Sequence, residues 1–160
     1  MTKIFNGRYT AKTDEPFVVF LIGMRINHWW RFDKWLPVAG AMAPMLQTLF
    51  THPEKGLLHT EFYFNFSGPL LIQYWRSFAD LERFARGADD PHLGPWKRYN
   101  QAVGADGSVG IWHETYLVEP DRYECVYGNM PAFGLGKAMQ HVQATGTRET
   151  ACLRLTANHG

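Results

Sequence analysis

The sequence predicts an α+β fold in which a four-stranded antiparallel sheet carries helices on one face. Apolar runs with the two-residue repeat of strands alternate with segments of helical spacing, in the order βαββαβ. The two middle strands are separated only by Ser67-Gly68-Pro69, a connection short enough for a hairpin. At 160 residues, 46% of them hydrophobic, the chain can bury one substantial core. We therefore expect residues 1–140 to form a single domain.

The first predicted strand follows a polar lead-in and runs from Phe17 to Asn27, where aliphatic, β-branched and aromatic residues succeed one another. An aromatic turn then leads into a helix from about Lys34 to Phe50. Pro37 suits the first turn of this helix, because a proline there removes no intrahelical hydrogen bond. Pro44 lies in the interior and is expected to kink the helix or divide it in two.

The second predicted strand, Leu57 to Ser67, alternates between two kinds of side chain. One face carries Thr60, Phe62, Phe64 and Phe66, and the other carries His59, Glu61, Tyr63 and Asn65. The third strand follows from Leu70 to Arg76, so the two strands form the hairpin.

Ser77 is a favourable N-cap for the next helix, which ends near Arg86-Gly87. A further helical stretch follows Pro91 and runs to about Val103, and the fourth strand spans Val109 to Val118. The complete order is that of the split βαβ, or ferredoxin-like, arrangement.

The C-terminal end and the uncovered sheet face lead to a prediction about assembly. Beyond Asp121 we expect a short strand and a loop rich in glycine and proline. Residues 141–160 are expected to form a tail that either crosses a dimer interface or is partly disordered. Helices on one face leave the other face of the sheet bare, and a second copy packed sheet to sheet would cover it. We therefore expect a homodimer.

Composition narrows the functional classes. The formal net charge is +1, so neither nucleic acid nor an anionic membrane is favoured as a partner. Cys125 and Cys152 form no metal-binding or redox spacing. The N-terminus lacks the apolar segment of a signal peptide, and the longest apolar run, Phe17 to Ile22, is far shorter than the roughly 20 residues of a membrane span. These features predict a cytoplasmic protein that acts on a small molecule.

Two histidines, 21 positions apart, are the main candidates for chemistry. His92 follows Asp-Asp-Pro near a helix start, and His113 lies in the middle of the fourth strand, on one face with Ile111 and Thr115. A helix packed across a sheet could aim both imidazoles into one gap. The alternatives are a surface histidine at position 92 and a hydrogen-bonded core histidine at position 113. Imidazole exchanges protons near neutral pH, so His113 could serve as an acid or base.

Other polar residues lie among apolar ones at strand positions. Arg25 and Asn27 share a face at the end of the first strand, and Gln73 and Trp75 share a face on the third. They either line a pocket or satisfy buried backbone groups. The methionines in the first strand and helix are typical core residues. The sequence contains no Gly-x-Ser-x-Gly, no His-Glu-x-x-His and no dinucleotide fingerprint, which disfavours hydrolase, zinc-enzyme and Rossmann functions.

Five segments together resemble a known family: Met24-Arg-Ile-Asn27, Lys34-Trp-Leu-Pro-Val38, Gln73-Tyr-Trp-Arg-Ser77, Gly110-Ile-Trp-His-Glu-Thr-Tyr116 and Asn129-Met-Pro-Ala-Phe-Gly-Leu-Gly136. The family comprises small bacterial proteins grouped with a fungal polyketide-pathway monooxygenase in the dimeric α/β-barrel superfamily. The resemblance covers roughly Phe5 to Ala138. It implies a ferredoxin-like homodimer and a monooxygenase-like oxidoreductase.

A more distant resemblance concerns Asp90-Pro-His92-Leu and Trp112-His113-Glu114, the latter followed by Tyr123-Glu-Cys. These segments are similar to the haem-containing aldoxime dehydratases. The resemblance implies that His92 is the proximal haem ligand and His113 the distal catalytic histidine, with Arg25 in place of that family's arginine. This chain has one ferredoxin-like unit where that family has two, and Gly94-Pro95 where that family's helix continues.

The resulting hypothesis is a homodimeric enzyme that binds one haem b per subunit between sheet and helices. His92 would ligate the iron, and Trp96 and Trp75 would form walls of the haem site. His113 would act as acid or base, with Arg25 and Gln73 as polarising groups. The alternatives are an aldoxime-dehydratase-like haem lyase, a cofactor-independent oxygenase, and a non-catalytic haem carrier or sensor.

Overall fold

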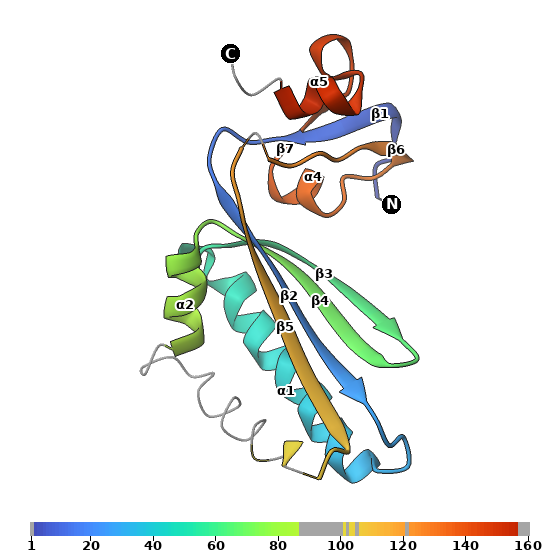
Figure 1. Cartoon of the computed structure of the whole chain (residues 1–160), viewed down its shortest axis with the longest axis vertical. Coiled ribbons are helices and arrows are strands. Elements are labelled where there is room, and N and C mark those ends of the chain that lie inside the picture. Colours follow the sequence, from blue (N-terminus) through green and yellow to red (C-terminus); the bar gives the residue numbers. More distant parts are fainter. Residues whose placement is uncertain (1, 87–100, 102, 105, 121, 157–160) are drawn as a thin grey trace.

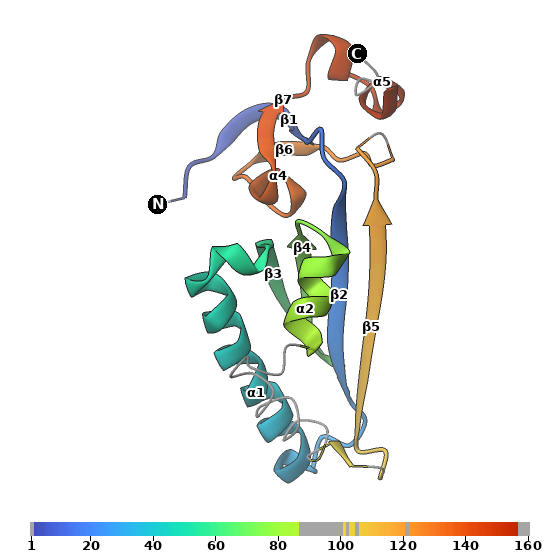
Figure 2. The ribbon, with the colours of Figure 1, turned by 90° about the vertical axis from the view of Figure 1, so that its left-hand side faces the viewer.

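The computed structural model describes residues 2–86, 101, 103–104, 106–120 and 122–156 (Figure 1). In this part of the chain four antiparallel strands form the main sheet, in the order β3-β4-β2-β5. Their bounds are Phe17–Ile26 for β2, Leu57–Asn65 for β3, Gly68–Trp75 for β4 and Val109–Val118 for β5. The helices α1 (Phe32–Thr51) and α2 (Phe78–Arg86) lie on one side of this sheet (Figure 2), and a short 3-10 turn, η1 (Pro53–Lys55), follows α1. The predicted α+β, ferredoxin-like fold is confirmed, whereas the helical stretch expected from Pro91 to Val103 lies largely outside the described residues.

The strand β2 runs through the middle of the sheet, and its alternation decides which side chains meet the helices. The even-numbered residues are all apolar and face α1 and α2: Val18, Phe20, Ile22, Met24 and Ile26. The residues paired with them in β5 lie on the same face: Leu117, Thr115, His113, Ile111 and Val109. The odd-numbered residues of β2 lie on the opposite face, which the helices do not cover.

The core between sheet and helices is built from large apolar side chains. Trp75 is fully buried, and it packs with Val18, Leu49 and Phe84, which come from β2, α1 and α2. The Trp75 and Phe84 rings lie 5.6 Å apart between centroids. A second cluster around Val38 holds the other end of α1 on the sheet.

The helix α1 runs unbroken past Pro44, so the expected division into two helices does not occur. The proline ring removes a hydrogen bond to the carbonyl of Gly40, four residues earlier. Both residues lie on the exposed side of α1, where water can bond to the freed carbonyl. The helix therefore tolerates Pro44 because its buried face keeps its packing.

A polar cluster caps the start of α2 and joins it to the end of β4. The Ser77 hydroxyl donates to Oδ2 of Asp80 over 2.8 Å and accepts the Asp80 backbone N–H over 3.1 Å, as the sequence predicts for an N-cap. Arg76 and Arg83 donate to the two carboxylate oxygens over 2.8 and 2.9 Å. The pKa of Asp80 is lower than usual, and the hydrogen bond from Arg76 makes the largest contribution to this shift. Burial of the carboxyl group acts in the opposite direction.

A second, three-stranded sheet lies at one end of the main sheet (Figures 1 and 2). Its middle strand is β1 (Phe5–Lys12), which pairs antiparallel with β6 (Tyr127–Met130) and β7 (Gln140–Gln143). The short helix α4 (Leu135–Ala138) connects β6 to β7. Ala11 and Leu135 of this unit form a buried cluster with Phe17, which lies on the helix-free face of the main sheet. The N-terminal residues are therefore a strand, where the sequence indicated only a polar lead-in.

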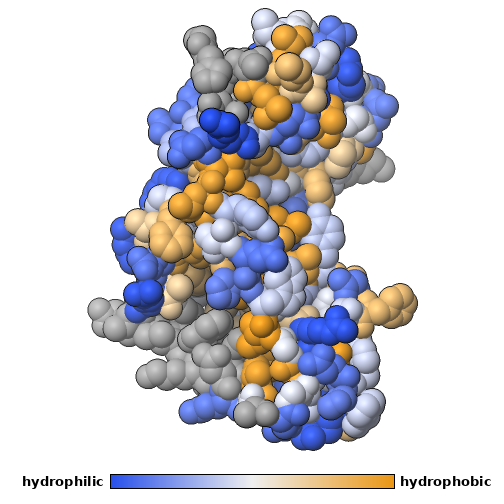
Figure 3. Space-filling view, in the orientation of Figure 1, coloured by the Kyte–Doolittle hydropathy of each residue, from blue (hydrophilic) through white to orange (hydrophobic). Residues whose placement is uncertain are grey.

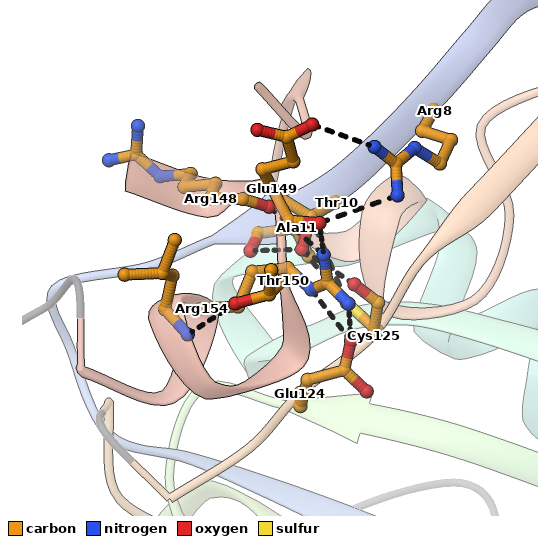
Figure 4. A network of polar contacts seen from close by, with 10 residues as sticks. Arg8, Thr10, Ala11, Glu124, Cys125, Arg148, Glu149, Thr150 and Arg154 are labelled. Atoms are coloured by element: carbon orange, nitrogen blue, oxygen red, sulfur yellow. Dashed lines mark hydrogen bonds and ion pairs between the residues drawn. The ribbon is translucent and has the colours of Figure 1, made fainter. Parts of the chain in front are cut away.

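Residues 144–156, expected to belong to a tail, fold back on the small sheet. The 3-10 turn η2 (Gly146–Arg148) and the helix α5 (Ala151–Thr156) are held there by Arg154 (Figure 4). Its Nε donates to Glu124 over 2.6 Å, and its Nη1 donates to the carbonyl oxygens of Arg148 and Glu149 over 2.9 and 3.0 Å. Because the Arg154 side chain is largely buried, these charged hydrogen bonds anchor the C-terminal segment within its own chain.

Among the described helices, not one has both the length and the hydrophobicity that crossing a bilayer requires.

Candidate functional site

A hydrophobic cavity lies between the main sheet and the two helices that cover it. Its empty space, including the open mouth, is about 560 Å³. The sheet contributes Phe20, Ile22, Gln73 and Trp75, α1 contributes Met42, Met45, Leu46 and Leu49, and α2 contributes Leu81, Phe84 and Ala85. Strand alternation and the helical spacing of the α1 residues place all these side chains between the two layers. A concave, mostly apolar space of this kind is the usual form of a small-molecule site.

Gln73 contributes a polar side-chain amide to the described lining of this cavity. Its side chain is 5% exposed, and its Oε1 accepts the indole N–H of Trp75 over 3.0 Å. Because the indole nitrogen can only donate, this bond fixes which end of the amide is the oxygen. The amide nitrogen is then free to donate, since no hydrogen bond from it occurs among the described residues. The predicted pairing of Gln73 and Trp75 on one face is thus found at the cavity wall.

His113 lies on the same face of the sheet but beside the cavity. It pairs with Ile22 in β2, and its ring lies 5.7 Å from the ring of Phe20, which lines the cavity. The side chain is exposed because β5 is an edge strand. His113 therefore lies on the predicted face of the sheet, but it is not the core histidine that was one alternative, and in the single chain its ring lies beside the cavity rather than inside it.

Arg25 does not join the other candidates. Met24 faces the helices, so the next residue in β2 points to the opposite face of the sheet. There the Arg25 Nε donates to Asn27 over 3.1 Å. The structure therefore separates Arg25 from His113 and Gln73 by the thickness of the sheet. The two remaining candidates, His92 and Trp96, lie outside the described residues.

The donor atoms of the cavity allow a test of whether the described residues fit a haem. Protein ligands of haem iron are histidine, cysteine, tyrosine or methionine side chains. The described lining contains no histidine, cysteine or tyrosine, and offers only the thioethers of Met42 and Met45. Among the described lining residues, only these two thioethers could ligate haem iron, and the expected proximal ligand, His92, lies outside the described residues.

Several cavity residues were not singled out from the sequence. The methionines of α1 were interpreted as core filler, yet Met42 and Met45 line the cavity. The spacing of Met42, Met45, Leu46 and Leu49 is the pattern of one helix face, which predicts burial but not whether the buried face leaves empty space. Periodicity therefore identifies the lining residues without distinguishing a packed interface from a cavity.

A second group of polar side chains lies on the helix-free face and holds the small sheet in place. Oε1 of Glu61 lies 2.9 Å from Nε2 of His59 and accepts the backbone N–H of Gly134 over 3.0 Å. Partial burial opposes ionisation of Glu61, but the hydrogen bonds from Gly134 and His59 hold its pKa below the usual value. This cluster joins β3 to the loop before α4, and we assign it a structural role.

Comparisons with known proteins agree with this architecture. The chain is 28% identical to Monooxygenase af470 of Aspergillus fumigatus over 167 aligned positions, which cover 86% of this chain and 56% of that protein. An aldoxime dehydratase crystallised with butyraldoxime has a similar fold, with a TM-score of 0.64 and 16% identity over 81% of this chain and 41% of that one. A dimeric ferredoxin-like protein from an uncultured marine organism gives a TM-score of 0.46 and 14% identity, over 65% of this chain and 96% of that one.

The chain thus spans about half the length of the fungal relative and less than half of the aldoxime dehydratase. The family described as Monooxygenase af470-like matches residues 17–135, which run from the first residue of β2 to the first residue of α4. This match includes the whole main sheet and the described cavity lining. The chain belongs to the Monooxygenase af470-like family.

Proposed function

We propose that this protein is a monooxygenase-like oxidoreductase that acts on a small, largely hydrophobic organic molecule bound between the main sheet and its helices. The observation that carries the proposal is the apolar cavity with one oriented amide, that of Gln73, in its described lining. Family membership supports the reaction class. In such a reaction one oxygen atom of O₂ enters the substrate and the other leaves as water, while two electrons come from a reductant or from the substrate itself.

Each described residue of the site has a definite task in this proposal. The apolar side chains of α1 and α2 exclude water and bind the hydrocarbon part of the substrate. The amide nitrogen of Gln73 donates a hydrogen bond to a hydroxyl or carbonyl oxygen of the substrate, which fixes its orientation. His113 lies next to Phe20 at the edge of the cavity and exchanges a proton with the substrate or with solvent.

The activity is tested with a compact aromatic probe such as 1-naphthol under ¹⁸O₂. We expect one ¹⁸O atom in the product by mass spectrometry. Gln73→Leu should raise KM more than it lowers kcat, because the lost contact acts mainly on substrate binding. Gln47→Leu is the matched control, since Gln47 lies on the exposed side of α1. Product without ¹⁸O, or equal kinetic effects of the two variants, would contradict the proposal.

Haem b bound through His92 is the candidate cofactor, and it would supply the activation of oxygen. The test is an absorption spectrum of the protein purified with haem supplied. A Soret band that is lost in His92→Ala and kept in His113→Ala supports His92 as the ligand, and the opposite result reverses the two roles. Turnover of 1-naphthol without any Soret band supports cofactor-independent oxygenation, and a Soret band without turnover supports a haem carrier or sensor.

The fold shared with an aldoxime dehydratase favours one alternative reaction, the dehydration of an aldoxime to a nitrile. Butyraldoxime, the compound bound in that crystal, is the appropriate probe. Nitrile formation that depends on His113 would replace the oxygenase proposal with a lyase. No nitrile under conditions that give oxygenated naphthol excludes the lyase.

The helix-free face of the main sheet supports a homodimer. Tyr63, Trp112 and Tyr116 are each more than a third exposed there. The Trp112 indole packs directly against Gly23, and a β-carbon at that glycine would lie only 2.6 Å from the ring. We propose that a second copy covers these aromatic side chains. Trp112→Arg should convert a dimer to a monomer by light scattering, whereas Phe66→Arg, at the almost fully exposed β3–β4 turn, should not.

A further inference from the structure

A second hydrophobic cavity lies under the other half of α1. Its empty space, including the open mouth, is about 520 Å³. The residues of α1 that line it are Val38, Ala39 and Met42, and the β3–β4 hairpin contributes Phe62 and Phe64. These phenylalanines are each 61% exposed, so this cavity opens at the hairpin. Figure 3 shows the opposite, helix-free side of the sheet, where hydrophobic and hydrophilic residues are interspersed.

The two cavities lie end to end along α1. Leu49 and Met45 line only the first, Val38 and Ala39 line only the second, and Met42 lines both. At about 1.5 Å per residue, Val38 and Leu49 are roughly 16 Å apart along the helix axis. The space under α1 is therefore elongated and divided near its middle.

The partition between the cavities has one movable side. Ile22 of β2 and Met42 of α1 border both cavities. Ile22 is buried and β-branched, so its χ1 angle is restricted. Met42 is unbranched and can adopt several conformations at low cost. Met42 is therefore the side of the partition that can move to let a ligand pass.

We propose that the substrate is an elongated, uncharged hydrophobic molecule with its oxygen at Gln73 and its tail past Met42 in the second cavity. This inference rests on the proposed function and adds the shape and class of the substrate. The described linings of both cavities contain no charged side chain. A charged tail would therefore lose its hydration without gaining a partner, which excludes ionised chains.

Alkanols of two lengths test the channel, because each has one hydroxyl for Gln73 and a tail that differs only in length. We expect 1-hexanol to bind in the first cavity and the longer tail of 1-decanol to extend past Met42 into the second. Four additional buried methylene groups should tighten binding on the order of 100-fold by calorimetry. Ala39→Phe fills the second cavity and should abolish this gain while leaving 1-hexanol affinity unchanged.

Gly40→Phe is the matched control, because it places the same ring one residue further on, where the space around the glycine is open. It should retain the full gain for 1-decanol. If Ala39→Phe does not fold, methyl NMR of wild-type methionines gives the same answer. Met24 borders only the second cavity and Met45 only the first. Both methyl signals should shift with 1-decanol, and only that of Met45 with 1-hexanol.

The outcomes separate this inference from the function on which it rests. If 1-hexanol binds with sensitivity to Gln73→Leu but 1-decanol gains nothing, the channel is wrong and the first cavity remains the substrate site. An unshifted Met24 signal with bound 1-decanol also overturns the channel. If neither alkanol binds, both the channel and the proposed substrate site are wrong.

Discussion

Trp75 donates its indole N–H to the side-chain oxygen of Gln73, and the two atoms lie 3.0 Å apart between sheet and helices. Both residues are almost completely buried. The bond connects the largest core side chain to the amide at the cavity wall. Packing of the core and orientation of the site therefore depend on the same pair.

We expect Gln73→Leu to lower the free energy of unfolding by about 1–3 kcal/mol, because it leaves the buried indole N–H without an acceptor. Urea titration measures the change. In a Trp75→Phe background the donor is already absent, so the additional effect of Gln73→Leu should nearly vanish. An equal loss in both backgrounds would show that the bond does not stabilise the fold.

Asp80→Asn should lower the free energy of unfolding by about 2 kcal/mol, because Asp80 loses its charged hydrogen bonds to Arg76 and Arg83. The Glu82→Gln variant is the control, since Glu82 pairs with an exposed Arg86 and should cost less than about 0.5 kcal/mol.

The same residue predicts a dependence on acid. The pKa of Asp80 is lower in the folded chain than its ordinary value of 3.8, so the unfolded chain binds the proton more readily. The stabilisation is complete above about that pH and is lost as the pH falls through the lower, folded-state pKa. The difference between wild type and Asp80→Asn should therefore shrink in strong acid. A constant difference would contradict this assignment.

His141 predicts a second pH effect, in the small sheet. Its ring stacks on Tyr9 with 4.6 Å between centroids, and neither ring nitrogen has a hydrogen-bond partner among the described residues. Burial lowers the pKa of His141 below 6.5, so the folded chain keeps the neutral ring while the unfolded chain takes up a proton. Stability should fall as the pH drops below about 6.5.

His141→Phe removes the titrating group and preserves the aromatic stacking on Tyr9. We expect a weaker dependence of the unfolding free energy on pH between about 8 and 5, and no loss of stability at the upper end, because the substitution also removes two unpaired polar atoms. An unchanged pH slope would show that His141 is not responsible for it.

Arg154→Ala should release the C-terminal segment while leaving the main sheet intact. Loss of its charged hydrogen bonds should speed amide exchange in residues 144–156 by about 10- to 100-fold. The Arg148→Ala variant is the control, because the Arg148 guanidinium extends away from the network and only its backbone carbonyl is used (Figure 4). Equal exchange in both variants would refute the anchoring role.

The main sheet was predictable because its strands, turn and helix cap are each specified by residues that are close together in the sequence. The alternation in β3 and the Ser77 cap each depend on a few neighbouring residues, and both appear where expected. The hairpin is also found, but its turn lies at Phe66 and Ser67, because Gly68 and Pro69 already pair with Asn65 and Phe64 in the ladder. The small sheet was missed because β1 is a polar strand whose partners lie more than a hundred residues away. The hydrophobic side chains that pack against β1 come from distant segments of the chain, and a local sequence pattern does not reveal them.

The candidate site was predicted in part for the same reason. Alternation places Gln73 and Trp75 together and puts His113 on their face of the sheet. Arg25 was assigned to the site by resemblance, but the helix-facing position of Met24 puts it on the other side. The cavity itself depends on how closely α1 approaches the sheet, a distance that no single segment encodes.

Because β1 lies between β6 and β7, the first dozen residues hold both partners of the small sheet. Removing them would leave β6 and β7 with exposed edges and no neighbour, even though both are encoded at the far end of the chain. Truncation of the N-terminus should therefore unfold the C-terminal strands β6 and β7. Truncated or tagged variants should keep the chain from Phe5 onward intact.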